Sequence, residues 1–140
     1  MPLVRLIYAS KKTDQWAESD LGRLIEGARN NNRRHMVTGC LVFNRKYFMQ
    51  CLEGSRAQVN EIYNLVAQDP RHSNIELLYY DYIDQRDFGD WDMHYVPDSK
   101  LSKELIKRFS GVDDLDPYLM TRKGSIEFLK QAVATNAGTL

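Results

Sequence analysis

Four polar side chains occupy positions where the sequence pattern predicts an apolar interior. Asn31 and Asn32 fall at the end of a helical apolar stripe. Gln50 shares the apolar face of a predicted strand with Phe48, and Tyr8 lies on the inner face of the first predicted strand. Buried amides need hydrogen-bond donors and acceptors as partners. Together these groups are suited to bind a flat ring with polar edges, such as a heterocycle that carries C=O, N–H and ring nitrogen groups.

A second interpretation needs no ligand. The four residues could satisfy one another and nearby backbone groups, forming a polar cluster that fixes the strand register. For any one of them alone, this interpretation is favoured. Because four such groups converge on one cleft between two helices, a bound ligand is the better explanation for the set.

Hydrophobic periodicity predicts the elements that position these side chains. Strands are expected over residues 3–9, 36–43, 47–54 and 75–83, with a shorter extended piece over 91–96. One helix is expected over 19–33, with Ser19 as its N-cap, and a second from 56 to just before Pro70. Two short helical segments are expected over 101–109 and 118–133.

The order strand, helix, strand, strand, helix, strand predicts an α+β protein with a ferredoxin-like βαββαβ sheet. Both early helices would cover one face of an antiparallel sheet. The opposite face also carries apolar side chains, so the C-terminal helical segment is expected to cover it. We therefore divide the chain into residues 1–97, which hold the cleft, and residues 98–140, a helical extension packed on the sheet.

Composition narrows the function classes. The 140 residues suffice for one domain, and 19 basic residues balance 19 acidic ones, which gives no general attraction to nucleic acid. No stretch has the length of a membrane span, no signal peptide is recognisable, and no metal-ligand spacing occurs. Cys40 and Cys51 lack paired spacing and are expected to be buried thiols. A cytoplasmic protein is the expectation.

The polar residues stand in a series of short motifs: Leu-Ile-Tyr8-Ala-Ser10, Asn31-Asn32, Thr38-Gly39, Phe48-Met-Gln50-Cys-Leu52-Glu53-Gly54, Asp69-Pro-Arg71-His72 and Phe88-Gly-Asp-Trp91-Asp-Met93. Over residues 1–97 this series resembles the BLUF family of blue-light sensors using flavin. Several motifs in one order are more specific than any one of them. The chain length and the helical tail are similar to those of the short stand-alone, PixD-type members.

The resemblance implies a flavin held noncovalently between the two early helices, usually FAD. FMN or riboflavin stays open, since no Gly-rich phosphate cradle is present. The implied cofactor-binding residues are Leu24, Ile25, Asn31, Asn32, Phe48, Gln50, Val66, Asp69, Arg71 and His72.

The resemblance also implies how the signal arises and where it goes. Tyr8 would donate an electron and a proton to the excited ring, and the hydrogen bonds of Gln50 would rearrange. Trp91 and Met93 would relay the change. A homo-oligomer and a response-regulator-like partner are implied, and no enzymatic activity.

Two other function classes are alternatives for this sequence. A light-independent interaction module could use a patch formed by Tyr79, Tyr80, Tyr82 and Tyr95. A small phosphate-handling hydrolase on the same fold is less favoured, because the candidate arginines stand on a helix rather than in a phosphate-binding loop. Its other candidate groups are scattered along the chain without a Ser, His, Asp order: Ser10, His35, His72 and His94.

Overall fold

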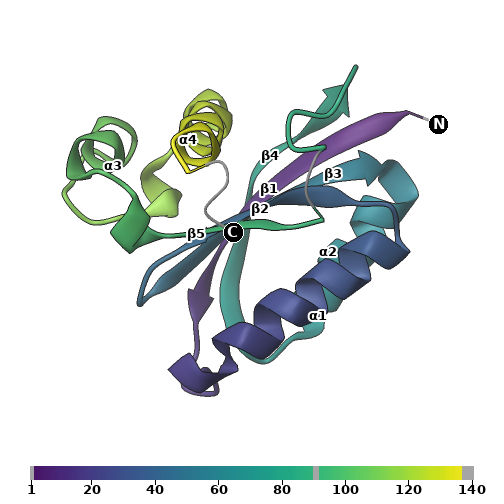
Figure 1. Ribbon diagram of the computed structural model, residues 1–140, viewed down its shortest axis with the longest axis horizontal. Coiled ribbons are helices and arrows are strands. Elements are labelled where there is room, and N and C mark those ends of the chain that lie inside the picture. Colours follow the sequence, from purple (N-terminus) through teal and green to yellow (C-terminus); the bar gives the residue numbers. More distant parts are fainter. Residues whose placement is uncertain (1, 90–91, 137–140) are drawn as a thin grey trace.

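A five-stranded sheet forms the centre of the structure, a computed structural model that describes residues 2–89 and 92–136. The strand order is β4-β1-β3-β2-β5, and helices lie on both sides of the sheet (Figure 1). The strands are β1 (Leu3–Lys12), β2 (Thr38–Phe43), β3 (Tyr47–Ser55), β4 (His72–Ile83) and β5 (His94–Pro97). Alternating and continuous apolar runs predicted all five, within a few residues at each end.

The first four strands confirm the ferredoxin-like α+β prediction. β1 pairs antiparallel with β3 and β4, and β2 pairs antiparallel with β3. β5 runs parallel to β2, so the sheet is mixed rather than wholly antiparallel. β1 and β3 lie at the centre with almost every residue buried, because helices cover both of their faces.

Helices α1 (Leu21–Arg34) and α2 (Arg56–Gln68) cover one face of the sheet. The side chains beneath α2 include Val4, Leu6 and Leu52. The predicted N-cap of α1 was wrong. Ser19 lies in a short 3-10 turn, Glu18–Asp20, and α1 begins directly after it, with Asp20 as the N-cap. The turn closes when the backbone N–H of Ala17 donates to the Asp20 carboxylate at 2.9 Å.

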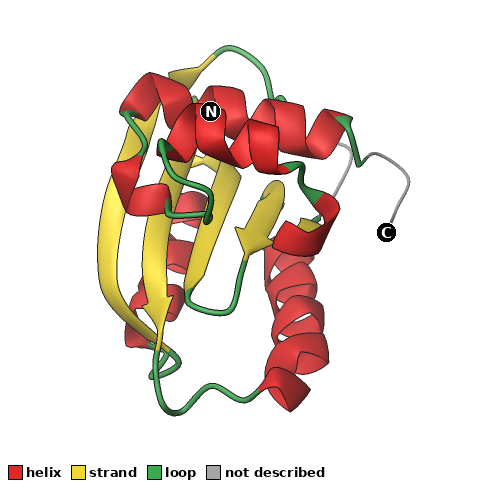
Figure 2. Cartoon of the chain, turned by 90° about the vertical axis from the view of Figure 1, so that its left-hand side faces the viewer, coloured by secondary structure: helices red, strands yellow, loops and turns green. Residues whose placement is uncertain are grey.

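Helices α3 (Lys103–Ser110) and α4 (Arg122–Ala134) cover the opposite face, as expected for the C-terminal segment. Figure 2 shows them crossing in front of one end of the strands. Phe128 and Leu129 of α4 belong to the same buried cluster as Ile7 and Met49 of the sheet. No helix of the described residues is long and apolar enough to cross a membrane.

The two cysteines are closer than their spacing in the sequence indicated. Cys40 and Cys51 are directly opposite each other on β2 and β3, and both are buried free thiols. Burial, followed by the neighbouring Cys40 thiol, raises the pKa of Cys51 well above its usual range. A protonated, buried thiol reacts slowly, so the pair serves as core packing.

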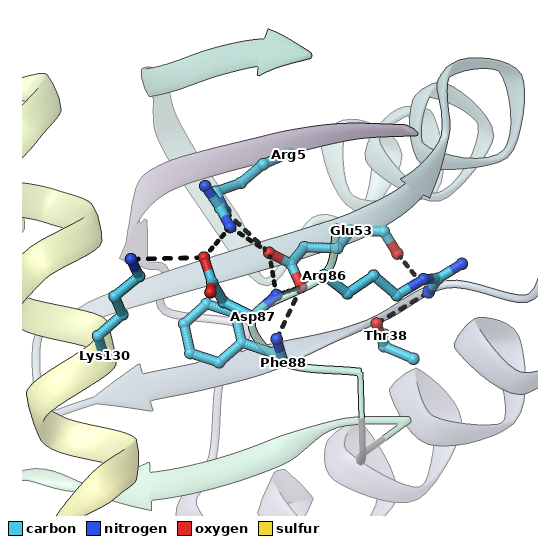
Figure 3. A network of polar contacts seen from close by, with 7 residues as sticks. All are labelled: Arg5, Thr38, Glu53, Arg86, Asp87, Phe88 and Lys130. Atoms are coloured by element: carbon cyan, nitrogen blue, oxygen red, sulfur yellow. Dashed lines mark hydrogen bonds and ion pairs between the residues drawn. The ribbon is translucent and has the colours of Figure 1, made fainter. Parts of the chain in front are cut away.

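A buried carboxylate fixes the loop between β4 and β5 (Figure 3). Glu53 is fully buried and accepts from Arg5 Nε at 2.8 Å. It also accepts from the backbone N–H groups of Asp87 and Phe88 at 3.0 and 2.8 Å. Asp87 in turn pairs with Arg5 and lies 3.5 Å from Lys130 of α4. The network therefore links the sheet, the loop that leads to Met93, and the C-terminal helices.

Candidate functional site

A cavity of about 150 Å³ lies between α1, α2 and the sheet. Its lining combines apolar walls with a polar floor and one charged end: Tyr8, Leu24, Gly27, Ala28, Asn31, Asn32, Leu41, Phe48, Gln50, Ile62, Leu65, Val66, Asp69, Arg71 and His72. A volume of this size takes roughly one benzene ring. A larger ligand therefore also uses the mouth, where Leu65 is 46% exposed.

The helix periodicity explains which side chains reach the cavity. On α1 the lining positions Leu24, Ala28 and Asn31 follow the i, i+4, i+7 pattern of a single face. On α2, Ile62, Leu65 and Val66 follow the related i, i+3, i+4 pattern, and Asp69 comes directly after the helix ends.

Ile25 is the one predicted cofactor-binding residue that the structure does not bring to this cavity. It follows Leu24 by about 100° around the helix and lines a separate hollow with Arg29 and Tyr95. Its side chain is nevertheless buried, with only 8% of it exposed.

Tyr8 and Gln50 form the centre of the polar floor. The two residues are directly opposite each other on β1 and β3, and the Tyr8 hydroxyl donates a hydrogen bond to Gln50 Oε1. Their exposed fractions are 1% and 4%. Burial, followed by the neighbouring Tyr63 and Asp69, raises the pKa of Tyr8 far above its usual range. The phenol therefore stays protonated, with its proton aimed at the amide oxygen.

Asn32 supplies an acceptor that no described residue satisfies. Its Nδ2 donates to the backbone oxygen of Asp92 at 2.6 Å, whereas its buried Oδ1 has no hydrogen-bond partner among residues 2–89 and 92–136. An unpaired buried carbonyl costs about 1–3 kcal/mol. Asn31, partly buried beside it, also lines the cavity. An N–H group on a ligand edge would satisfy Asn32 Oδ1, so the residues present fit a ring with an N–H and C=O edge.

His72 closes the side of the cavity near the start of β4. Its ring lies 4.7 Å from the ring of Phe48, and its Nδ1 lies 2.7 Å from Ser10 Oγ. Burial lowers the pKa of His72 to about 4, so the ring is neutral at neutral pH. Ser10 and His72, read from the sequence as scattered, thus meet in the fold. Ser10 is fully buried, and the nearby Asp69 carboxylate is bound by Arg71 rather than by the imidazole, so the pair lacks the geometry of a nucleophilic site.

Asp69 and Arg71 form the charged end of the cavity. Arg71 donates from Nε and Nη2 to the two carboxylate oxygens of Asp69, at 3.0 and 2.7 Å. Burial alone would raise the pKa of Asp69, but the hydrogen bonds and charge of Arg71 outweigh it and lower that pKa. The pair leaves other guanidinium hydrogens available for a polar ligand chain.

Met93 connects the polar floor with the segment before β5. Gln50 Nε2 lies 3.5 Å from the Met93 sulfur, and the Met93 side chain is 1% exposed. Arg29 of α1 donates to the Met93 backbone oxygen at 3.1 Å, and Arg33 binds the Asp92 carboxylate at 2.9 Å. The second predicted relay residue, Trp91, lies outside the described residues.

Sequence reasoning missed several apolar wall residues. Leu41 is directly opposite Gln50 on β2, which sequence periodicity alone cannot reveal because the register is a tertiary property. Ile62 and Leu65 could have been found, since they share a helical face with Val66.

Matches to known proteins agree with this site. The family model described as "Sensors of blue-light using FAD" (BLUF) matches residues 3–94. The blue light- and temperature-regulated antirepressor BluF of Escherichia coli K12 is 41% identical over 87 residues, covering 62% of this chain and 22% of that protein. The photoactivated adenylate cyclase subunit beta of Euglena gracilis is 25% identical over 126 residues, covering 89% of this chain and 14% of that protein. The chain thus spans a small part of the length of these relatives.

Two solved structures share the fold over most of their length. The photo-activated state of BlsA superimposes with a TM-score of 0.82 at 29% identity, covering 94% of each chain. The dark state of BlrB, described as a BLUF protein, gives a TM-score of 0.77 at 26% identity, covering 96% of this chain and 97% of that one. Because the family model matches the residues of the cavity and the first four strands, the chain belongs to the BLUF family of flavin-binding blue-light sensors.

Proposed function

We propose that the cavity holds the ring of a flavin noncovalently between α1 and α2, with its polar edge toward Asn31, Asn32 and Gln50. The observation that carries this assignment is the buried Asn32 Oδ1, which has no hydrogen-bond partner in the described part of the chain. Asn32 lines the cavity together with Tyr8 and Gln50. Leu24, Phe48 and Val66 supply apolar walls. Asp69, Arg71 and His72 bind the polar chain of the cofactor.

When bound, the flavin absorbs blue light and becomes a strong oxidant. With the flavin bound, Tyr8 would be the electron donor, and Gln50 Oε1, the acceptor that its hydroxyl already contacts, would take the hydroxyl proton. Once the electron is returned, the proton would move back from Gln50 to Tyr8. Because the Gln50 amide can both donate and accept, it would be left in a rearranged hydrogen-bond pattern with the redox state of Tyr8 restored.

Met93 is the proposed first receiver of that rearrangement, since Gln50 Nε2 contacts its sulfur. Asp92 lies beside Met93 and is bound by both Asn32 and Arg33. A change in the hydrogen bonds of Asn32 and a change in those of Gln50 would therefore reach the same segment. We assign Trp91 to the same relay on the resemblance to the family. The segment continues into β5, and the loop before it is held by Glu53.

The broader assignments are inferred from the family. We infer FAD as the cofactor, in line with the family description, with FMN or riboflavin as alternatives; Arg71 supports a phosphate-bearing chain. Residues 1–97 would form the flavin-binding unit, and residues 98–140 an extension that takes part in output. We infer a cytoplasmic homo-oligomer, without catalytic activity of its own, that signals to a response-regulator-like protein.

An absorption spectrum tests the proposal. The purified chain should be yellow, and brief blue light should shift the flavin band to longer wavelength, with recovery in darkness. Release by heat and chromatography identifies the flavin. A colourless protein that takes up none of the three flavins on reconstitution would contradict the proposal.

A further inference from the structure

A hollow of about 300 Å³ lies at the far end of α1, outside the flavin cavity. Six residues that line it form what we call the Met36 surface: Leu3, Arg34, Met36, Ser55, Gln58 and Arg86. We propose that the Met36 surface binds a segment of a partner protein that carries a carboxylate beside an apolar side chain.

Met36 presents an apolar side chain to solvent on a fixed backbone. It is 74% exposed, the most exposed of the large hydrophobic side chains in the described residues. Its φ is 55°, in the left-handed region that side chains other than glycine rarely adopt. Three hydrogen bonds hold the turn: Met36 N–H to Arg33 O, Val37 N–H to Asn32 O, and Arg86 Nη2 to Met36 O, at 3.3, 2.8 and 2.9 Å. The first two of these bonds form a Schellman ending of α1, which presents the methionine to solvent, and exposed methionines suit contact surfaces.

The charge of this surface is uncompensated. Arg34 is exposed and makes no hydrogen bond or ion pair within the described part of the chain. The three acceptors of Arg86 are neutral: Thr38 Oγ1 and the backbone oxygens of Glu53 and Met36, at 2.8, 3.0 and 2.9 Å. Figure 3 shows the contacts with Thr38 and Glu53. No carboxylate is among the described residues that line the hollow. The carboxylate beside the hollow, that of Glu61, lies 3.8 Å from His35 Nε2 and pairs with neither arginine. Two guanidinium groups that pair with no carboxylate of the described residues favour an incoming one.

Gln58 distinguishes a peptide from a simple anion. Its Oε1 is buried and has no hydrogen-bond partner among the described residues. This acceptor needs a hydrogen-bond donor, which the N–H groups of a peptide backbone supply and a sulfate ion does not. Leu3 and Met36 add apolar contacts that an inorganic anion could not use.

The Met36 surface adjoins the flavin site through the backbone of α1. The Val37 and His35 N–H groups donate to Asn32 O at 2.8 and 3.2 Å, so the turn is bonded directly to a cavity residue. The surface thus offers a place for the partner that the proposed function requires. Binding itself can be measured in darkness, so this proposal and the photochemical one fail independently.

The test uses the flavin-loaded full chain, labelled with ¹⁵N, in darkness. It is titrated with acetyl-leucyl-glutamyl amide and, separately, with the uncharged acetyl-leucyl-glutaminyl amide. We expect saturable shifts of the backbone amides of Met36, Ser55 and Gln58 with the glutamyl probe, in the millimolar range. The glutaminyl probe should bind about tenfold more weakly, as expected for the loss of charge-assisted hydrogen bonds.

Two matched variants check the location. Arg34→Ala, which removes no internal contact, should weaken binding by about fivefold to tenfold. Arg23→Ala removes an exposed arginine elsewhere on α1 and should leave binding unchanged.

Three results would overturn the proposal: no shifts at this surface with either probe, equal binding of both probes, or equal loss in the two variants. Inorganic phosphate producing the same shifts at the same concentration would show an ion site only and would also overturn it.

Discussion

Tyr8 is directly opposite Gln50 in the β1–β3 ladder, and its hydroxyl donates to the amide oxygen across that pair. The two residues belong to the rigid centre of the sheet, where both faces are covered by helices. Their geometry is therefore fixed by backbone pairing rather than by a mobile loop. A proton donor and its acceptor held in this way need little rearrangement before transfer.

Tyr8→Phe should abolish the light-induced spectral shift while flavin stays bound. The variant keeps the aromatic ring but loses the only O–H that contacts Gln50 Oε1 in the described structure. Flavin affinity should change by less than about tenfold, since the lost hydroxyl forms its hydrogen bond with Gln50 of the protein rather than with the flavin. The measurement is a light-minus-dark absorption spectrum.

Tyr63→Phe is the matched control for Tyr8→Phe. Tyr63 lies edge-on to Tyr8 with ring centroids 5.8 Å apart, yet its hydroxyl takes no part in the Gln50 contact. Its photocycle should be close to that of the unmodified chain. A normal shift in Tyr8→Phe would remove Tyr8 from the mechanism.

Gln50→Leu should also lose the shift and retain flavin. Leucine fills a similar space but can neither accept from Tyr8 nor donate to Met93. Met93→Leu serves as the control, because it removes only the weak sulfur acceptor; it should keep the shift and change the rate of dark recovery. An intact shift in Gln50→Leu would exclude amide rearrangement as its source.

Asn32→Ala should weaken flavin binding by about fivefold to thirtyfold, or ~1–2 kcal/mol, the usual value of a buried hydrogen bond. It removes the unpaired Oδ1 and the bond to the Asp92 backbone. Asn30→Ala, an exposed position on the same helix, should bind flavin normally. The readout is the dissociation constant from fluorescence titration, and equal affinities in the two variants would argue against Asn32 as a ligand.

Much of this site could be predicted because strand parity and helix periodicity fix the faces of side chains. Strand parity predicted that Tyr8 and Gln50 lie on the helix-covered face, and helix periodicity predicted that Asn31 and Asn32 point inward. The structure shows both. Neither pattern contains the register between strands. The sequence therefore could not show that Tyr8 and Gln50 are directly opposite each other.

The remaining differences also have tertiary causes. Ile25 is one residue from Leu24, and the apolar stripe is wide enough to include both, but only one side of it faces the cavity. Ser10 meets His72 because β1 and β4 pair with two register shifts, which no local pattern encodes. Parallel pairing of β5 likewise depends on the path of the β4–β5 loop, which Glu53 fixes.

Stability should fall as the pH drops from about 6.5 to about 4, because of His72. Burial lowers its folded pKa to about 4 from an ordinary value of 6.5. Between these values the unfolded chain binds a proton that the folded chain does not, so acidification favours unfolding by up to ~3 kcal/mol. Urea unfolding across this range measures the slope.

His72→Gln is the comparison for that slope. It should show a shallower loss of stability over the same range, because glutamine does not titrate. A residual slope is expected, since burial also lowers the pKa of His94. Identical slopes for both proteins would show that the protonation of His72 does not contribute.

Glu53→Gln should destabilise the fold by about 3 kcal/mol, within the range for breaking a buried ion pair. The change leaves the Arg5 guanidinium, whose side chain is 7% exposed, with Asp87 as its remaining carboxylate partner. Lys130→Ala removes the exposed end of the same network and should cost less than about 1 kcal/mol. Urea midpoints at constant slope give both values. If both variants are equally mild, the buried carboxylate is not what holds the β4–β5 loop, and the proposed path from Gln50 through Met93 must rest on the contacts of α1 with Asp92 instead.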